Sequence, residues 1–159
     1  MNDDPQLLFP AGLSDAAAAA LCDFLHELAA AADTRYLART QEQLEAAFQF
    51  DDPEFMAVLA IDSRDRVLGL ALFGAVAGAR RCRRLHALLG DDASLAALAD
   101  GVAHLCAESG ERLVVGELPD ETLFLPALAA LERSGFVEEG RVDDFVCDGV
   151  ALRLMVWRP

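Results

Sequence analysis

The stretch that decides the fold is Leu131-Glu-Arg-Ser-Gly-Phe-Val-Glu-Glu-Gly-Arg141, near the carboxyl end of a chain of 159 residues. Gly135 follows a helical pattern, and a glycine just past a helix adopts the left-handed backbone conformation that other side chains resist. A strand is expected to run through Phe136. The acidic segment Asp143-Asp-Phe-Val-Cys-Asp-Gly149 then returns the chain into the apolar run from Val150 to Trp157. The carboxyl-terminal part is therefore predicted to be a helix, a strand, an acidic hairpin and a last strand.

Hydrophobic periodicity predicts the elements on the amino-terminal side of this segment. Apolar residues recur at helical spacing from 14 to 32 and again after the capping pair Thr40 and Gln43, whereas apolar runs between turn residues indicate strands. The predicted strands cover 6–10, 55–61, 66–77, 85–89 and 113–118, and the other predicted helices cover 91–110 and 126–134. The order is strand, two helices, three strands, helix, strand, helix and two strands.

This order predicts one domain over residues 1–159, of the α/β (α+β) class. Its sheet is expected to be mixed but mostly antiparallel, with about six or seven strands and about four helices on both faces. A chain of this length buries about 70% of the surface of its unfolded state, which is enough for a stable core without disulfide bonds or metal ions. The apolar fraction of 54% agrees with a compact domain.

The composition is acidic, with a formal net charge of −14. Nucleic acids and anionic membranes attract clustered positive charge, so neither is expected as a partner, whereas a cationic ligand is compatible. The first residues show no basic and apolar leader, and the apolar run from Ala16 to Ala32 contains Asp23, His26 and Glu27. We therefore expect a core-facing helix, no membrane span and a cytoplasmic protein.

The cysteines and histidines are too scattered to suggest a metal site. Four cysteines and three histidines are present, without a C-x-x-C pair or the ligand spacing of zinc sites. No metal is therefore predicted. The default expectation for such cysteines is a reduced, buried thiol in a reducing compartment.

Residues 132–141 follow the sequence pattern Glu-Arg-x-Gly-Phe-x-Glu-x-Gly-Arg. This pattern, together with the element order, resembles the carboxyl-terminal part of GNAT-superfamily N-acetyltransferases. The resemblance covers most of the chain and is best from Phe55 onward. It implies transfer of an acetyl group from acetyl-CoA to an amine, either a small molecule or a protein N-terminus. It also implies that the strands at 85–89 and 113–118 splay apart, with the pantetheine arm in the cleft against the backbone of the former strand.

The resemblance places the phosphates of the coenzyme at the loop that follows this strand, here Leu88-Leu-Gly-Asp-Asp-Ala-Ser94. It implies cofactor contacts from five residues: Leu88, Leu89, Gly90, Ala93 and Ser94. The family pattern has two glycines there, whereas this chain has one glycine, two aspartates and a shorter loop. A carboxylate about 5 Å from a phosphate charge repels it by roughly 3 kcal/mol at an effective dielectric of 20. As helix caps, by contrast, the two aspartates are well suited.

Two residues are candidates for the general base that takes a proton from the amine. His86 lies on the strand beside the expected cleft, and the ordinary pKa of an imidazole suits the task. Glu117 lies at the end of the next predicted strand. The family often has a tyrosine four residues before the Gly-Phe pair as the acid for the departing thiolate, but this chain has Leu131, and its only tyrosine is Tyr36.

Two functions of different class remain open. One is an acyl-CoA-dependent N-acetyltransferase whose amine pocket would be lined by the first two helices and the final hairpin. The other is a GNAT-fold module that has lost catalysis and binds a partner, for which a homodimer is one arrangement. The chain has a single basic cluster, which consists of Arg80, Arg81, Arg83 and Arg84. These are either solvated charges on a strand, or residues that bind the ribose phosphate of the coenzyme or an acidic partner.

Overall fold

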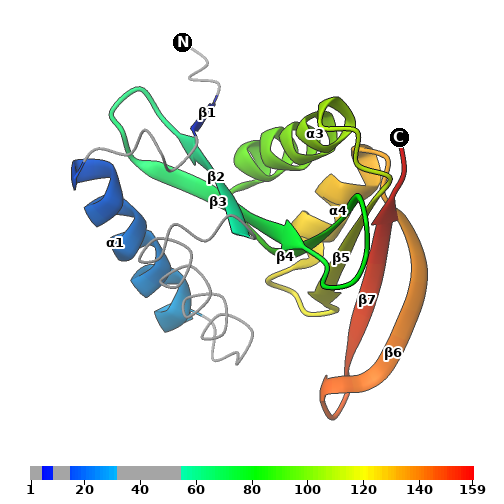
Figure 1. Cartoon of the computed structure of the whole chain (residues 1–159). Helices are drawn as coiled ribbons and strands as arrows, with labels where there is room; N and C mark the ends of the chain where they lie inside the picture. The colour runs from blue at the N-terminus through cyan, green and yellow to red at the C-terminus, as the bar shows by residue number, and fades with distance from the viewer. Residues whose placement is uncertain (1–4, 9–14, 32–54) are drawn as a thin grey trace.

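A computed structural model describes residues 5–8, 15–31 and 55–159, and all of its strands belong to one sheet (Figure 1). The strand order across the sheet is β1-β2-β3-β4-β5-β7-β6. The strands are β1 (Gln6–Leu8), β2 (Phe55–Ile61), β3 (Val67–Ala75), β4 (Cys82–Gly90), β5 (Leu113–Pro119), β6 (Val137–Cys147) and β7 (Val150–Trp157), and the helices are α1 (Asp15–Ala31), α3 (Asp92–Glu108) and α4 (Leu125–Arg133). The predicted helix after Thr40, like Tyr36, lies outside the described residues.

The sheet is mixed and mostly antiparallel, as predicted. Strands β1 to β4 form an antiparallel meander, and β5, β7 and β6 form a second antiparallel set. The two sets join through β4 and β5, which run parallel. A parallel pair needs a crossover connection, and α3 provides it between these two strands.

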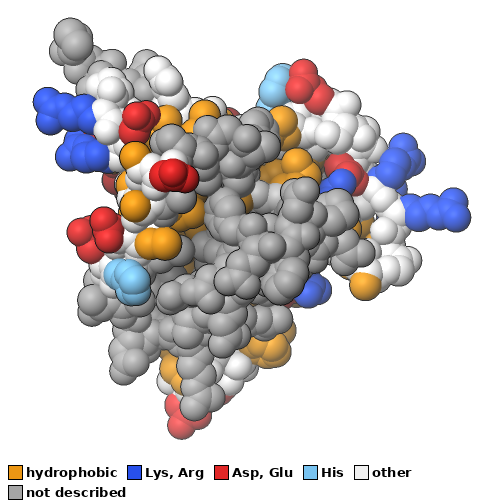
Figure 2. All heavy atoms as spheres, turned by 60° about the vertical axis from the view of Figure 1, so that its left-hand side comes forward, with side chains coloured by type: hydrophobic (Ala, Val, Ile, Leu, Met, Phe, Trp, Pro, Cys, Tyr) orange, Lys and Arg blue, Asp and Glu red, His pale blue; other side chains and the backbone are white. Residues whose placement is uncertain are grey.

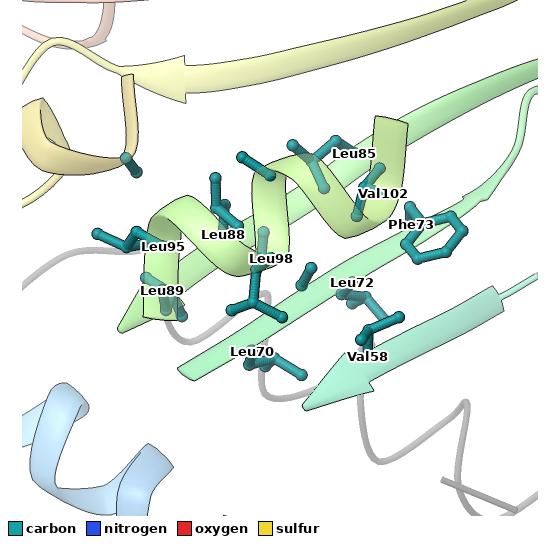
Figure 3. Close-up of a cluster of buried hydrophobic side chains, with 14 of the residues drawn as sticks. Val58, Leu70, Leu72, Phe73, Leu85, Leu88, Leu89, Leu95, Leu98 and Val102 are labelled. Carbon is teal, nitrogen blue, oxygen red and sulfur yellow. The ribbon is translucent and has the colours of Figure 1, made fainter. Parts of the chain in front are cut away.

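Helices cover both faces of the sheet (Figures 1 and 3). Helices α3 and α4 contact each other, and α3 packs on β2, β3 and β4, while α1 contacts β3 from the other side. On α3, Leu95, Leu98 and Val102 are almost fully buried, and Leu105 is half-buried against the same core. In Figure 3 the first three of these side chains lie among those of β3 and β4, and the cluster forms the main core. No described helix is long and apolar enough to cross a membrane.

The end of α4 has the geometry predicted for the opening segment. Gly135 has a φ of 89°, and its N–H donates to Glu132 O while the Phe136 N–H donates to Leu131 O at 3.0 Å. These two bonds form the Schellman motif, which satisfies carbonyls that a helix end leaves unpaired. The Phe136 ring then packs 6.5 Å from the ring of Trp157, between centroids, which fixes the start of β6 against the end of β7.

The acidic hairpin is formed, but its turn is shorter than the charge pattern indicates. Strand β6 continues to Cys147, so that Asp148 and Gly149 make the turn into β7. The pairing register shifts between Val142 and Cys147, which means that an irregular bulge absorbs the residues between them. Asp144 adopts a φ of 53° there, and its carboxylate accepts the Gly149 N–H at 2.7 Å. This local bond lets a polar segment remain within a strand.

The helix α3 approaches the sheet closely where two glycines face each other. Gly69 of β3 pairs with Gly90 of β4. A Cβ atom on Gly69 would lie 2.9 Å from both the Leu89 carbonyl oxygen and Leu98 Cδ1. The Cβ and Oγ atoms of Ser94 occupy a fully buried position above this pair. The two glycines therefore permit the first turn of α3 to rest on the backbone of the sheet.

The prediction that all four thiols are buried is wrong for two of them. Cys82 and Cys106 are buried, but Cys22 on α1 and Cys147 at the edge strand are exposed. For Cys106, desolvation by burial, with the nearby Glu111 carboxylate, raises the pKa to about 11.

We predict that replacing Gly69 by alanine destabilises the fold, whereas replacing Gly116 does not. The added methyl at Gly69 meets a carbonyl oxygen at 2.9 Å, so the backbone must shift, and overpacking of this kind costs about 1–3 kcal/mol. A Cβ on Gly116, another buried strand glycine, would have contacts no closer than 3.6 Å. Urea unfolding of both variants measures the difference. Equal stabilities would contradict the close approach of α3.

The thiols should react in two classes. At pH 8 we expect DTNB to titrate Cys22 and Cys147 rapidly in the native protein, because both are exposed. Cys106 should stay unreactive until unfolding, because its thiol is buried and remains protonated at this pH. The amplitude of the fast phase, divided by the total amplitude in denaturant, gives the fraction of cysteines that react in the native protein. The control is a variant in which serine replaces both Cys22 and Cys147, and this variant should show no fast phase. A full fast phase in the variant would contradict the assignment.

Candidate active site

The sheet forks between β4 and β5. The two strands pair over only four positions, from Cys82 with Leu113 to Leu85 with Gly116. Beyond Leu85, β4 remains paired with β3 as far as Gly90, whereas β5 remains paired with β7 as far as Pro119. The strands therefore separate after Gly116, as the resemblance implies. Along this stretch no described strand pairs with the side of β4 that faces β5.

A β-bulge in β4 marks the point where the fork opens. Phe73 of β3 pairs with Leu85, but its neighbour Leu72 pairs with Ala87, which leaves His86 as an extra residue. A bulge of this kind bends its strand and increases the local twist, and here it turns β4 away from β5. His86 is half-buried. The predicted candidate base therefore lies at the bend, and its catalytic role remains a prediction.

Glu117 lies on the other arm of the fork. It follows Gly116 directly, so His86 and Glu117 each come one residue after the last parallel pair. The Glu117 side chain is one-third exposed, and its Oε1 lies 3.2 Å from Nη2 of Arg84. The structure thus brings the two predicted catalytic residues to the same point of the sheet. The pairing of Arg84 with Glu117 was not predicted, because it depends on the register between β4 and β5.

The inner side of the fork is apolar. Leu131 of α4 is fully buried, and its Cδ1 lies 3.6 Å from the place where a Cβ on Gly116 would sit, beside Leu85 and Met155. This position under the fork is the one for which the resemblance implies a tyrosine. A leucine offers no proton, so any acid for a leaving thiolate must come from another residue or from water.

The connection from β4 to α3 consists of a single residue, Asp91. Its carboxylate accepts the Ser94 N–H and its carbonyl oxygen accepts the Leu95 N–H, both at 2.8 Å. Asp91 is thus the N-cap of α3, and Asp92 is the first helical residue. The first-turn amides of a helix are the groups that bind phosphates. Here one of them, the Ser94 N–H, already donates to the Asp91 carboxylate.

The five residues predicted to contact the cofactor lie in one continuous stretch. Leu88 and Leu89 are buried on the β4 arm, and Gly90 ends that arm with a φ of 151°. Ala93 and Ser94 belong to the first turn of α3. The Ser94 hydroxyl is fully buried and has no hydrogen-bond partner among the described residues, so it does not face outward toward a phosphate. Contact between this stretch and a cofactor remains a prediction.

The predicted basic cluster is divided by the fold. The Arg83 Nε donates to the nearly buried Glu111 at 2.7 Å, and Arg84 pairs with Glu117, so half of the cluster is neutralised. Arg80 and Arg81 are exposed in the turn before β4. Figure 2 shows that, on the face turned toward the viewer, the visible basic side chains lie in separate groups at the left and the right of the molecule. The described residues therefore form no continuous basic surface on this face.

A separate cavity of about 340 Å³ lies between α1 and the start of β3. Asp23, Phe24 and Glu27 line it from α1, and Arg66, Val67 and Leu68 line it from the other side. It therefore involves the first helix, one of the elements predicted to line an amine pocket. Among the described residues, no group of three or more acidic, histidine or cysteine side chains could hold a metal ion.

Comparison with solved structures identifies the fold. A proposed GNAT-family acetyltransferase from Desulfovibrio desulfuricans superposes with a TM-score of 0.75 at 19% identity, over 97% of this chain and 98% of that chain. An aminoglycoside 6′-N-acetyltransferase from Enterococcus faecium gives 0.67 at 14%, over 96% of each chain. Spermidine N-acetyltransferase from Vibrio cholerae, in complex with CoA and spermine, gives 0.66 at 13%, over 99% and 96%. No family model and no curated protein matches the sequence. The chain therefore has the GNAT fold.

We predict that Asp91 stabilises α3 as a cap and not through its charge. Asp91→Ala should lower the free energy of unfolding by about 1 kcal/mol, because the Ser94 N–H loses its acceptor. Asp91→Asn should be nearly neutral, since asparagine caps helices as well as aspartate does. Urea unfolding at neutral pH measures both changes. Equal losses in the two variants would show that the charge, and not the hydrogen bond, carries the effect.

Proposed function

We propose that the chain transfers an acyl group, acetyl in the simplest case, from a coenzyme A thioester to the nitrogen of an amine. The observation that carries this proposal is the fork, where the β4 backbone from Ala87 to Gly90 pairs with β3 and with no other described strand. Unpaired backbone groups of a strand bind an extended ligand through its amides. The pantetheine arm is such a ligand, since it is linear and contains two amide groups.

The residues at the fork suit the proton transfer that amine acylation requires. The amine nitrogen bonds to the carbonyl carbon of the thioester, the carbon–sulfur bond breaks, and the nitrogen loses a proton. Glu117 is proposed as the acceptor of that proton, directly or through water, with His86 as the alternative base. The Arg84 guanidinium lies beside Glu117, with its Nη2 3.2 Å from the Glu117 Oε1. The thiolate takes up a proton from water, because Leu131 has none to give.

The proposed acceptor is a cationic amine. The net charge of −14 attracts cations, and the cavity beside α1 carries Asp23 and Glu27 on its wall. Structural neighbours include enzymes named for spermidine and for aminoglycosides, and both compounds are polyamines. These names belong to the neighbours, and they support only the choice of the first compounds to test. A peptide with a free N-terminus is the other acceptor class.

A second candidate function is a partner-binding module without catalysis. Two observations favour it: the Asp91 carboxylate holds an amide that would otherwise serve a phosphate, and Leu131 stands where the resemblance implies a proton donor. A module of this kind would not respond to acetyl-CoA. Binding of the donor therefore separates the two candidates before any acceptor is known.

The proposal predicts saturable binding of acetyl-CoA and amine-dependent release of free thiol. Saturating donor at 100 times its Kd should add about 2.7 kcal/mol of stability, which a thermal shift detects. With a polyamine, an aminoglycoside or a peptide as acceptor, Glu117→Gln should lower kcat by about a hundredfold or more, because the base is lost. The matched control is Glu108→Gln, an exposed glutamate at the far end of α3. No shift at millimolar acetyl-CoA would overturn the enzyme and favour the module.

A further inference from the structure

We infer that the fork selects its donor by the acylated pantetheine arm alone, and that Asp91 makes the nucleotide diphosphate of coenzyme A dispensable for binding. This inference rests on the proposed function and names its donor class. The ligand chemistry is a pantetheine thioester without a diphosphate, carried either by a free pantetheine or by a protein-bound phosphopantetheine arm. Asp91 is the specificity-determining residue.

The first argument is that part of the anion site of α3 is already occupied. The Asp91 carboxylate accepts the Ser94 N–H at 2.8 Å, and this N–H is one of the first-turn amides that a helix itself leaves unpaired. A phosphate approaching this helix end would have to displace a carboxylate that is covalently part of the chain. The hydrogen bond it would gain is one that the protein already has.

The second argument is that the helix end cannot move away from the sheet to make room. Gly69 and Gly90 let α3 rest on the backbone, and a Cβ on Gly90 would lie 2.8 Å from Gly69 Cα. Ser94 is fully buried against this pair, and the Asp91 N–H donates to Leu68 O at 3.3 Å. The one-residue connection is thus fixed on both sides, by the core and by β3.

The third argument is electrostatic. Asp91 and Asp92 are adjacent and exposed, so a diphosphate at this helix end would meet two carboxylates. One such charge pair about 5 Å apart at an effective dielectric of 20 weakens binding by more than about a hundredfold. Arg66, which directly precedes β3, provides no free counter-charge, because its Nε and Nη2 bond to the buried Asp62 at 2.7 and 2.6 Å. Asp62 in turn is held ionised, since hydrogen bonds from Arg66 and Arg64 lower its pKa.

The test compares three donors that share the thioester and the arm: acetyl-CoA, S-acetyl-4′-phosphopantetheine and S-acetylpantetheine. Their Kd values are measured by calorimetry on the full chain, and kcat/KM is measured with one amine. We expect S-acetylpantetheine to bind within about threefold of acetyl-CoA, or more tightly. Added salt should strengthen acetyl-CoA binding, because it screens repulsion. S-acetyl-4′-phosphopantetheine distinguishes the sources: equal binding favours a carrier-bound arm, and weaker binding favours a free pantetheine thioester.

Two variants make the result specific to Asp91. Asp91→Asn retains the cap but removes the charge, so acetyl-CoA should bind about a hundredfold more tightly while S-acetylpantetheine is unchanged. Asp148→Asn, at an exposed aspartate in the turn between β6 and β7, removes the same charge elsewhere and should alter neither Kd.

The inference is overturned if acetyl-CoA binds at least about tenfold more tightly than S-acetylpantetheine to the unaltered chain, a result that leaves the proposed function standing. If none of the three donors binds, the proposed function itself fails and the inference with it.

Discussion

The close approach of α3 to the sheet at Gly69 and Gly90 is the constraint on which the candidate site depends. Without side chains on this glycine pair, the first turn of the helix can lie on the backbone of β3 and β4, and Ser94 becomes fully buried. The strand then passes into the helix through Asp91 alone. Since no loop remains to supply amides, the helix must satisfy its first turn from its own cap. Packing in the core thereby determines the electrostatics of a surface site.

The fork follows from how the chain distributes its backbone hydrogen bonds. Strand β4 can keep its pairing with β3 through the bulge at His86, but the resulting bend removes it from β5. Strand β5 keeps its pairing with β7 to Pro119. Each arm is thus supported on its outer side, and beyond Leu85 no described strand pairs with the inner edge of β4. A rigid opening of this kind lies in the middle of a sheet, where side chains from both arms meet.

The sequence allows the architecture to be predicted because its strongest signals are local. The Gly135 helix end, the strand periods and the Asp91 cap each depend on a few neighbouring residues, and the structure confirms the geometry of the first and the last. The bulge at His86 and the contact between Arg84 and Glu117 depend on registers between strands far apart in sequence, and no local pattern specifies them. The exposure of Cys147 likewise depends on the place of β6 at the edge of the sheet, which no local pattern specifies. The fold was therefore predictable, whereas the pairing within the site was not.

An acidic protein that binds an anionic cofactor must obtain its affinity from something other than charge. In this chain the arginines on the β4 arm are engaged: Arg83 with Glu111 and Arg84 with Glu117. Backbone groups along an open strand carry no net charge and bind amides independently of the overall field. A ligand held in this way is recognised by its length and its amide spacing. The short connection and the two aspartates differ from a phosphate-binding loop, and they are compatible with the proposed recognition of the neutral arm of a donor.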